Sequence, residues 1–298
     1  MEQLNNLSTE QRNSKTSDLD LLSIKEIIEI MNNEDLNVVS AVKKALPQIE
    51  IVIEAMVHTL KNNGRIVYTG AGTSGRTGII DAVECGPTFG CTDEFIGLIA
   101  GGNNAVFKAV EGAEDSKQLG EDDLKSINFS ENDLLIGIAA SGRTPYVIGG
   151  IEYAKKLGAK TACVCCNENT AIGSLVDYPI EVNAGPEILT GSTRLKSGTC
   201  QKVIVNMLST TSMICMGKVY KNLMVDVKAT NEKLVQRCRR IVMEATDCDY
   251  DTADEALKKT SNDCKEAIVM ILLDIDYSQA KEKLKKSNGF VRKALKDN

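Results

Sequence analysis

The chain has 298 residues, of which 43% are hydrophobic and 26% charged, an ordinary composition for a globular protein with a full hydrophobic core. Its 35 Lys and Arg against 41 Asp and Glu give a formal net charge of −6, so it lacks the basic excess that binds nucleic acid or an anionic membrane. Aromatic residues make up only 4%, without tryptophan, which argues against base-stacking platforms. We therefore expect neither a nucleic-acid nor a membrane partner.

The ten cysteines do not indicate a disulfide framework. The first residues contain no basic segment followed by an apolar one, so we expect no secretory signal and a cytoplasmic location with reduced thiols. Cys163 and Cys166 have C-x-x-C spacing, but they lie in the apolar run Thr161–Cys166, where cysteine acts as a small hydrophobe. His58 is the only histidine, and no second cysteine pair has zinc-site spacing. The sequence therefore predicts no metal site.

Residues 1–55 are expected to form N-terminal helices. Residues 1–16 are polar and predicted to be frayed. Ser23–Glu26 is a capping box that begins a helix. Pro47 suits the first turn of a further helix, which should stop at Asn62–Gly64.

Residues 56–224 show a strand and helix alternation. Short apolar runs are separated by helical stretches, which predicts a doubly wound, mainly parallel sheet with flanking helices. The expected strands are Arg65–Thr69, Phe95–Ala100, Leu134–Ala140, Thr161–Cys166 and Tyr178–Val182.

Residues 225–298 contain no strand signal and are expected to form a small helical bundle. A second capping box is predicted at Thr252–Glu255. Asp263–Leu273 and Ser278–Lys286 are amphipathic, and Asn288-Gly289 should end the second of them.

A glycine-rich loop follows the first predicted strand. Gly70–Gly75 matches G-x-G-x-x-G, so a dinucleotide site has to be considered. That site needs an acid at the end of the next strand, whereas Asp93 and Glu94 precede that strand. The hydroxyls of Thr73 and Ser74, with the backbone N–H groups from Gly72 onward, better suit the oxygens of a phosphate monoester.

A second loop of the same kind follows the strand Leu134–Ala140. It carries Ser141, Gly142, Arg143 and Thr144 before Pro145. Two such loops at the carboxyl ends of parallel strands should meet at one crevice. The alternative is that these Ser and Thr residues only cap helices.

A third hydroxyl-rich stretch, Gly185–Thr199, contains Ser192 and Lys196 and precedes another helix. It could bind an anion, or it could be an ordinary solvated helix start. Glu84 and Glu114 are notable carboxylates, but spacing alone does not select them from other glutamates.

Three segments resemble one known family. They are GRIVYTGAGTSGRTGIIDAVECGPTFG, GIAASGRTPYVIGGIEYAKKLG and GPEILTGSTRLKSGTCQKVIVNMLST. They resemble the N-acetylmuramic acid 6-phosphate etherases of the sugar-isomerase (SIS) superfamily, whose signature is shared with the glucokinase regulatory proteins.

The resemblance implies a homodimeric cytosolic lyase that binds a small sugar phosphate and needs no cofactor or metal. It would convert N-acetylmuramic acid 6-phosphate to N-acetylglucosamine 6-phosphate and D-lactate, in cell-wall recycling. By resemblance Glu114 is the base at sugar C2, and Glu84 protonates the leaving lactate and then activates water. An acid working near neutrality would need its pKa raised by burial. The phosphate would be held by Thr73, Ser74, Ser141 and Thr144. The residues expected to bind the substrate or its phosphate are, in all, Gly72, Thr73, Ser74, Ser141, Gly142, Arg143, Thr144, Ser192 and Lys196.

The sequence departs from the family pattern at one position: family members commonly have proline where this chain has Gly86. We expect the glycine to loosen a turn after Glu84 and to leave the carboxylate in place. Two alternative functions share the same loops. A sugar-phosphate isomerase needs only one base, so the second glutamate favours elimination. A non-catalytic sugar-phosphate regulator need not keep both acids.

Overall fold

The computed structural model describes residues 7–229 and 231–296, which form two compact units. The first comprises the chain up to Val83 together with Asp93–Ser209. The second comprises Glu84–Thr92 and the chain from Thr210 onward. The sequence predicted domain boundaries after residues 55 and 224, and these boundaries remain a prediction. The N-terminal helices pack in the same unit as the sheet.

The first unit is built on a parallel sheet. In the described residues it has five strands in the order β2-β1-β3-β4-β5, with every neighbouring pair parallel. The predicted strands are confirmed to within one residue at each end, because short apolar runs buried on both faces are typical of parallel sheets. They are β1 (Ile66–Gly70), β2 (Phe95–Ile99), β3 (Leu134–Ala139), β4 (Lys160–Cys165) and β5 (Tyr178–Glu181).

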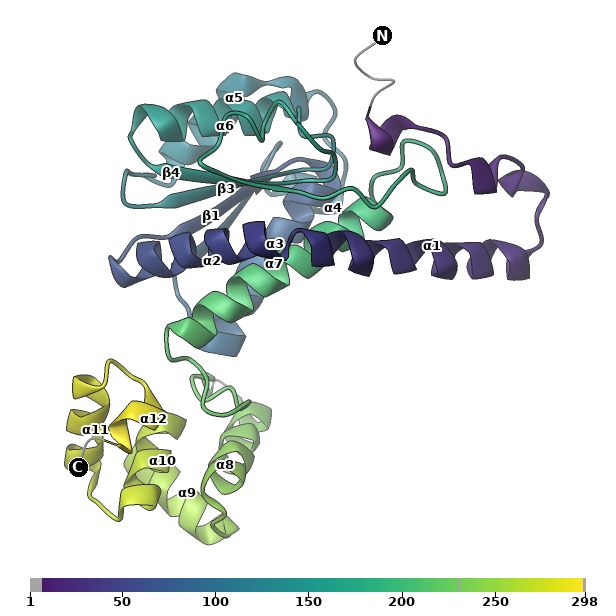
Figure 1. Ribbon diagram of the computed structural model, residues 1–298. Coiled ribbons are helices and arrows are strands. Elements are labelled where there is room, and N and C mark those ends of the chain that lie inside the picture. The colour runs from purple at the N-terminus through teal and green to yellow at the C-terminus, as the bar shows by residue number, and fades with distance from the viewer. Residues whose placement is uncertain (1–6, 230, 297–298) are drawn as a thin grey trace. The chain divides into compact units, whose positions relative to one another are not determined.

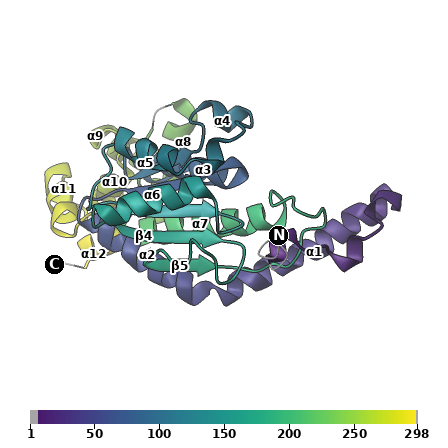
Figure 2. The same cartoon turned by 90° about the horizontal axis from the view of Figure 1, so that it is seen from above.

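Helices cover both faces of this sheet (Figures 1 and 2). On one face, α5 (Lys117–Ser126) packs against α6 (Pro145–Lys156), and Val147 and Ile151 of α6 enter a core with Leu135 and Cys163. The other face carries α2 (Leu46–Lys61) and those parts of α3 (Gly72–Phe89) and α7 (Lys196–Cys215) that belong to this unit. The doubly wound fold is therefore confirmed.

The helix following β1 and the helix following β3 lie on opposite faces, although the two strands are neighbours. This arrangement makes the β1–β3 boundary a topological switch point. A crevice opens there, outside the carboxyl ends of the strands.

The helix α1 (Ile24–Lys44) precedes α2, from which Ala45 separates it, and extends beyond the edge of the sheet (Figure 1). The capping box at Ser23 and Glu26 is confirmed, and Pro47 lies in the first turn of α2. The predicted stop is also confirmed: α2 ends at Lys61, and Asn63 takes a φ of 60°. The local signals therefore decide these boundaries.

The expectation of a frayed N-terminus is wrong for residues 7–16, here called the N-terminal strap; residues 1–6 lie outside the described residues. The strap contains two short 3-10 helices, η1 (Ser8–Glu10) and η2 (Ser14–Thr16). Thr9, Asn13 and Thr16 are buried. Their polar groups are satisfied by partners far along the chain, such as Asn167 for Thr9 and the Ile188 carbonyl for Thr16.

A buried ion pair fastens the strap to α1 and α7. The Glu34 carboxylate lies 2.7 Å from Lys196 Nζ and 2.9 Å from Lys15 Nζ, and it accepts a hydrogen bond from Asn13 Nδ2. The Lys196 side chain is only 2% exposed. Burial opposes ionisation of Glu34, but hydrogen bonds from Lys196, Lys15 and Asn13, together with the charge of Lys196, outweigh it and lower the pKa of Glu34 from 4.5 to about 2.

We expect Lys196→Met to lower the free energy of unfolding at pH 7 by roughly 3 kcal/mol, since it leaves a buried carboxylate with one exposed lysine partner. Because the folded-state pKa of Glu34 lies below the unfolded value, its contribution is complete above pH 4.5 and is lost as the pH falls toward about 2. Urea titrations across this range should show that acid loss in the native chain and a smaller one in Lys196→Met. The exposed Lys43→Met is the control; an equal effect there would contradict the assignment.

The second unit contains the predicted C-terminal bundle. Its helices are α8 (Glu232–Thr246), α9 (Tyr250–Lys259), α10 (Cys264–Leu273), α11 (Tyr277–Lys286) and α12 (Val291–Ala294). Their apolar faces share one core that includes Val242, Leu257 and Ile268. The capping box predicted at Thr252 is wrong: Asp249 caps α9 by accepting a hydrogen bond from the Thr252 backbone N–H.

Cys163 and Cys165 lie buried in β4, as the strand interpretation predicts. Among the described residues, no three His, Cys, Asp or Glu side chains gather as a metal ion would require. Within residues 7–229 and 231–296, no helix is both long enough and apolar enough to cross a membrane.

Candidate functional site

The switch point of the sheet carries a cavity of about 590 Å³, here called the switch-point pocket. It brings together the carboxyl ends of β1 and β3, the first turn of α3, the segment before α6, and two residues of the strap. Its lining comprises Leu7, Glu10, Ala71, Gly72, Thr73, Ser74, Glu114, Asp115, Ile138, Ala139, Ala140, Ser141, Arg143, Thr144, Pro145, Gly191 and Thr193. The first two predicted loops therefore meet at one crevice, and the third supplies only Gly191 and Thr193.

The first loop is a tight turn from β1 into α3. A Cβ atom on Gly75 would lie 2.7 Å from the Gly70 carbonyl oxygen, so a larger residue would push the loop open. α3 begins at Gly72, which places Thr73 and Ser74 in its first turn. Backbone N–H groups at that position lack helical acceptors and attract anions.

Ser74 has a partner that the sequence did not predict. Its hydroxyl donates to Gln201 Oε1 on α7 at 2.9 Å, and Gln201 is fully buried. In the described part of the chain Gln201 Nε2 has no hydrogen-bond partner. If the Gln201 side-chain amide is rotated by about 180°, its Nε2 donates a hydrogen bond to Ser74 Oγ. The hydroxyl proton of Ser74 is then free to bind a ligand.

The second loop carries a hydroxyl that does not cap a helix. Thr144 is the N-cap residue of α6, yet its side chain makes no capping hydrogen bond. The capping alternative therefore does not apply to Thr144, whose hydroxyl lines the pocket instead. Gly142 has a φ of 67°, and a Cβ there would lie 2.3 Å from Thr170 Cβ, so glycine is required at this position.

The third stretch differs from the expectation. Glu187 is fully buried and accepts hydrogen bonds from the backbone N–H groups of Lys196 and Ser197, so this chain's own carboxylate occupies the helix start that was expected to attract an anion. Lys196 is paired with Glu34. Only Gly191 and Thr193 of this stretch line the switch-point pocket. The structure brings neither Ser192 nor Lys196 to it.

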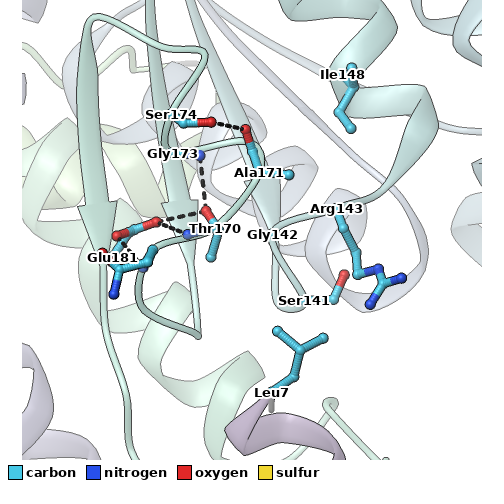
Figure 3. A pocket seen from close by; sticks show the side chains of 11 residues that line it. Leu7, Ser141, Gly142, Arg143, Ile148, Thr170, Ala171, Gly173, Ser174 and Glu181 are labelled. Carbon is cyan, nitrogen blue, oxygen red and sulfur yellow. Dashed lines mark hydrogen bonds between the residues drawn. The ribbon is translucent and has the colours of Figure 1, made fainter. Parts of the chain in front are cut away.

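A second cavity of about 800 Å³, here called the loop pocket, lies across the same Ser141–Arg143 loop (Figure 3). Ser141 and Arg143 line both cavities, whereas Gly142 lines only this one. Leu7 of the strap faces them across the opening in Figure 3. On the other wall Glu181 accepts hydrogen bonds from the Thr170 backbone and hydroxyl, both 2.7 Å, so its carboxylate holds the loop in place.

The two candidate catalytic acids lie in different units. Glu114 lies in the short 3-10 helix η4 (Ala113–Asp115), where it lines the switch-point pocket with its exposed side chain. Glu84 lies on α3 and is the first residue of the second unit. α3 continues through Gly86 and Pro87 to Phe89, so the turn expected after Glu84 is wrong. Glu84 is exposed, so the burial expected for this side chain is not supplied by the described chain alone.

Asp81, three residues before Glu84, ties α3 to α7 within the first unit. Its carboxylate accepts hydrogen bonds from Asn206 Nδ2 at 2.8 Å and Ser209 Oγ at 3.1 Å. Burial raises the pKa of Asp81. Because Asp81 is only 2% exposed, this carboxylate fixes the helix and does not face the pocket.

Sequence reasoning missed several residues of the pocket: Leu7, Glu10, Asp115 and Thr193 line it, and Gln201 lies behind Ser74. Asp115 follows Glu114 directly and could have been considered with it. Thr193 belongs to the hydroxyl-rich stretch Gly185–Thr199, whereas Leu7, Glu10 and Gln201 reach the site through long-range packing that leaves no local signal.

Two family models match the chain. One, described as the glucokinase regulatory protein N-terminal SIS domain, matches residues 48–155; another, described as the SIS domain, matches residues 118–211. The solved phosphoheptose isomerase GmhA from Neisseria gonorrhoeae has a TM-score of 0.50 with 16% identity, covering 64% of this chain and 98% of that chain. The fold and these matches define the class: the chain is a SIS-domain protein.

Full-length relatives narrow this class. The chain is 58% identical to an N-acetylmuramic acid 6-phosphate etherase of Bacillus cereus (strain G9842), over 98% of this chain and 100% of the relative. It is 60% identical to that of Lactococcus lactis subsp. cremoris (strain MG1363), over 98% and 99%. The chain belongs to the N-acetylmuramic acid 6-phosphate etherase family.

Proposed function

We propose that this chain is a carbon–oxygen lyase that cleaves the D-lactyl ether of N-acetylmuramic acid 6-phosphate. The products are N-acetylglucosamine 6-phosphate and D-lactate. The observation that carries the proposal is the high identity over the full length to relatives of that name. The switch-point pocket supports it, because hydroxyl loops and the Glu114 carboxylate line the same cavity.

The reaction needs one base and one acid. In the open-chain sugar the C1 aldehyde acidifies the proton on C2, and the lactyl ether on C3 is β to that carbon. Glu114 takes the C2 proton, and the C3–O bond then breaks while Glu84 protonates the departing lactate oxygen. Water adds to C3, activated by the Glu84 carboxylate, and the proton returns to C2. Atoms balance, and no redox change occurs.

The phosphate is held away from the reacting carbons, so its binding energy orients them without taking part in bond breaking. We assign it to the first turn of α3 and the loop before α6, through Gly72, Thr73, Ser74, Ser141 and Thr144. Arg143 supplies a positive charge at the edge. The assignment of Gly142, Ser192 and Lys196 as phosphate ligands has no such support.

Glu84 and Glu114 are both exposed in the single chain, so their surroundings there do not make one an acid and the other a base. A general acid works best when its surroundings differ from those of the base, so we expect Glu84 to be covered during the reaction. The bound substrate and a second copy of the chain are the available sources of cover. The burial predicted for Glu84 is therefore proposed for the assembled, substrate-bound enzyme.

We also propose a homodimer in the cytoplasm, acting without cofactor or metal. On one side of α1, Ile24, Ile28, Leu36 and Val39 are 81%, 57%, 66% and 69% exposed, an apolar stripe that suits burial against a second copy. Sedimentation of the native chain and of Ile28→Lys tests this. A dimer lost in the variant is expected, and a native monomer would contradict it.

Ser74→Ala should raise KM for N-acetylmuramic acid 6-phosphate by about ten- to hundredfold, the cost of a lost hydrogen bond to a charged group, with little change in kcat. Steady-state kinetics measures this. Ser174→Ala is the matched control, because Ser174 lies in the loop pocket and its hydroxyl donates to the Ala171 carbonyl. A rise in KM for Ser174→Ala instead would place the phosphate in the loop pocket.

Turnover in oxygen-18 water tests the proposed bond cleavage. Elimination and water addition should place the label on the C3 hydroxyl of the sugar, because the sugar C3–O bond breaks. Mass spectrometry of the two products locates it. Label in the lactate would mean that the other C–O bond breaks and would overturn the mechanism.

A further inference from the structure

The N-terminal strap forms part of the wall of the switch-point pocket. Leu7 and Glu10 line that cavity together with the β1 and β3 loops. Neither residue belongs to a loop that the sequence identified, and neither has a role in the reaction proposed above.

The backbone at Glu10 is fixed from both sides. On one side, Thr9 is 2% exposed, and its hydroxyl accepts a 3.0 Å hydrogen bond from Asn167 Nδ2, which also donates to the Ala140 carbonyl at the end of β3. On the other, Asn13 is 8% exposed and donates to Glu34 and to the Pro186 carbonyl. These contacts anchor the strap to the framework of the sheet, so the position of Glu10 is set before any ligand arrives.

The Glu10 carboxylate is not used by the fold. A Cβ atom on Gly191 would lie 3.8 Å from Glu10 Oε2, which places the carboxylate beside the loop that also supplies Thr193 to the pocket. Among the described residues, the Glu10 side chain has no hydrogen bond and no ion pair. An anchored residue with an unused charged acceptor facing a cavity is suited to a ligand.

The charges indicate which part of a ligand it takes. The substrate carries a phosphate and a lactyl carboxylate, both negative, and a carboxylate beside either would be repelled. Sugar hydroxyls and the acetamido N–H are neutral donors, and a charged acceptor binds such donors strongly.

We infer that Glu10 is a specificity-determining residue, whose carboxylate accepts hydrogen bonds from the hydroxyl or acetamido N–H groups of the sugar. The inference rests on the proposed function for the identity of the sugar phosphate. Glu10 orients the sugar in two ways: it binds the polar donors and repels the anionic groups from its end of the pocket.

Calorimetry with two ligands tests the inference in the full chain. Glu10→Ala should weaken binding of N-acetylglucosamine 6-phosphate by about ten- to hundredfold. Binding of inorganic phosphate should be unchanged or slightly tighter, since a negative charge is removed. Glu10→Gln, which keeps an acceptor oxygen, should lose less. Gln11→Ala is the control, because this exposed neighbour lies on the same strap and outside the pocket lining.

An equal loss for both ligands would mean that Glu10 only supports the strap, and no loss for the sugar phosphate would mean that it does not contact the sugar. Either result overturns the inference. If the native chain binds the sugar phosphate in a Glu10-dependent way but releases no lactate, the proposed function fails while this inference stands.

Discussion

Replacing Glu84 with Gln is expected to lower kcat by about a hundred- to ten-thousandfold, the usual contribution of a general acid or base. The amide keeps the size of the side chain but cannot protonate the leaving lactate or activate water. Binding of inorganic phosphate and of N-acetylglucosamine 6-phosphate should stay within about threefold of native, because we assign the phosphate to other residues. Steady-state kinetics and calorimetry on the same preparation measure both.

The matched control for this substitution is Glu131→Gln. Glu131 is exposed and precedes β3 at its amino end, whereas the switch-point pocket lies at the carboxyl ends of the strands. We expect native kcat and KM there. If Glu84→Gln loses binding and turnover by the same factor, then Glu84 supports the structure and does not act on the ether.

Replacing Glu114 with Gln is expected to abolish removal of the C2 proton. The signature is isotopic: in deuterium oxide the native enzyme should place deuterium at sugar C2, because the base exchanges its proton with solvent before returning it. Glu114→Gln should lower that incorporation, and lactate release with it, by about a hundredfold or more. Proton NMR of the sugar product measures the exchange.

Glu111→Gln is the control for the base. Glu111 is exposed, three residues before Glu114, and does not line the pocket. It should exchange at the native rate. Full exchange in Glu114→Gln would move the base to another group, and Asp115, which lines the same cavity, would be the first to test.

The sheet could be predicted from the sequence because each strand is a short apolar run with helical spacing on either side. β1 and β3 are buried along their whole length, and no charged residue within them competes with that pattern. The two loops after these strands could be predicted for the same reason, since chain order and parallel pairing determine where their hydroxyl groups lie.

Residues that depend on distant partners could not be predicted. Lys196 lies in a hydroxyl-rich stretch two residues after Arg194, a pattern typical of an anion site. Its partner in the structure is instead Glu34, 162 positions away in the sequence. The strap is as polar as a frayed end, but its buried groups bond to Asn167 and to the Ile188 carbonyl. A side chain satisfied by a partner more than 100 residues away leaves no periodicity to detect.

The cap of α9 illustrates a smaller error. Asp249 and Thr252 are both good N-cap residues three positions apart. The sequence pattern favoured Thr252 because Glu255 follows it, whereas in the structure the helix begins one turn earlier. Glu84 and Glu114 are exposed in the single chain, and the cover proposed for Glu84 comes from a ligand or a second copy, which a pattern within one chain does not reveal.

The most direct test of the central claim is release of D-lactate from N-acetylmuramic acid 6-phosphate by the purified protein. The assay contains EDTA and no added nucleotide or cofactor, and a stereospecific lactate determination measures the product. We expect stoichiometric D-lactate and N-acetylglucosamine 6-phosphate. No lactate from a folded protein that binds the sugar phosphate tightly would contradict the lyase assignment and indicate a sugar-phosphate-binding regulator.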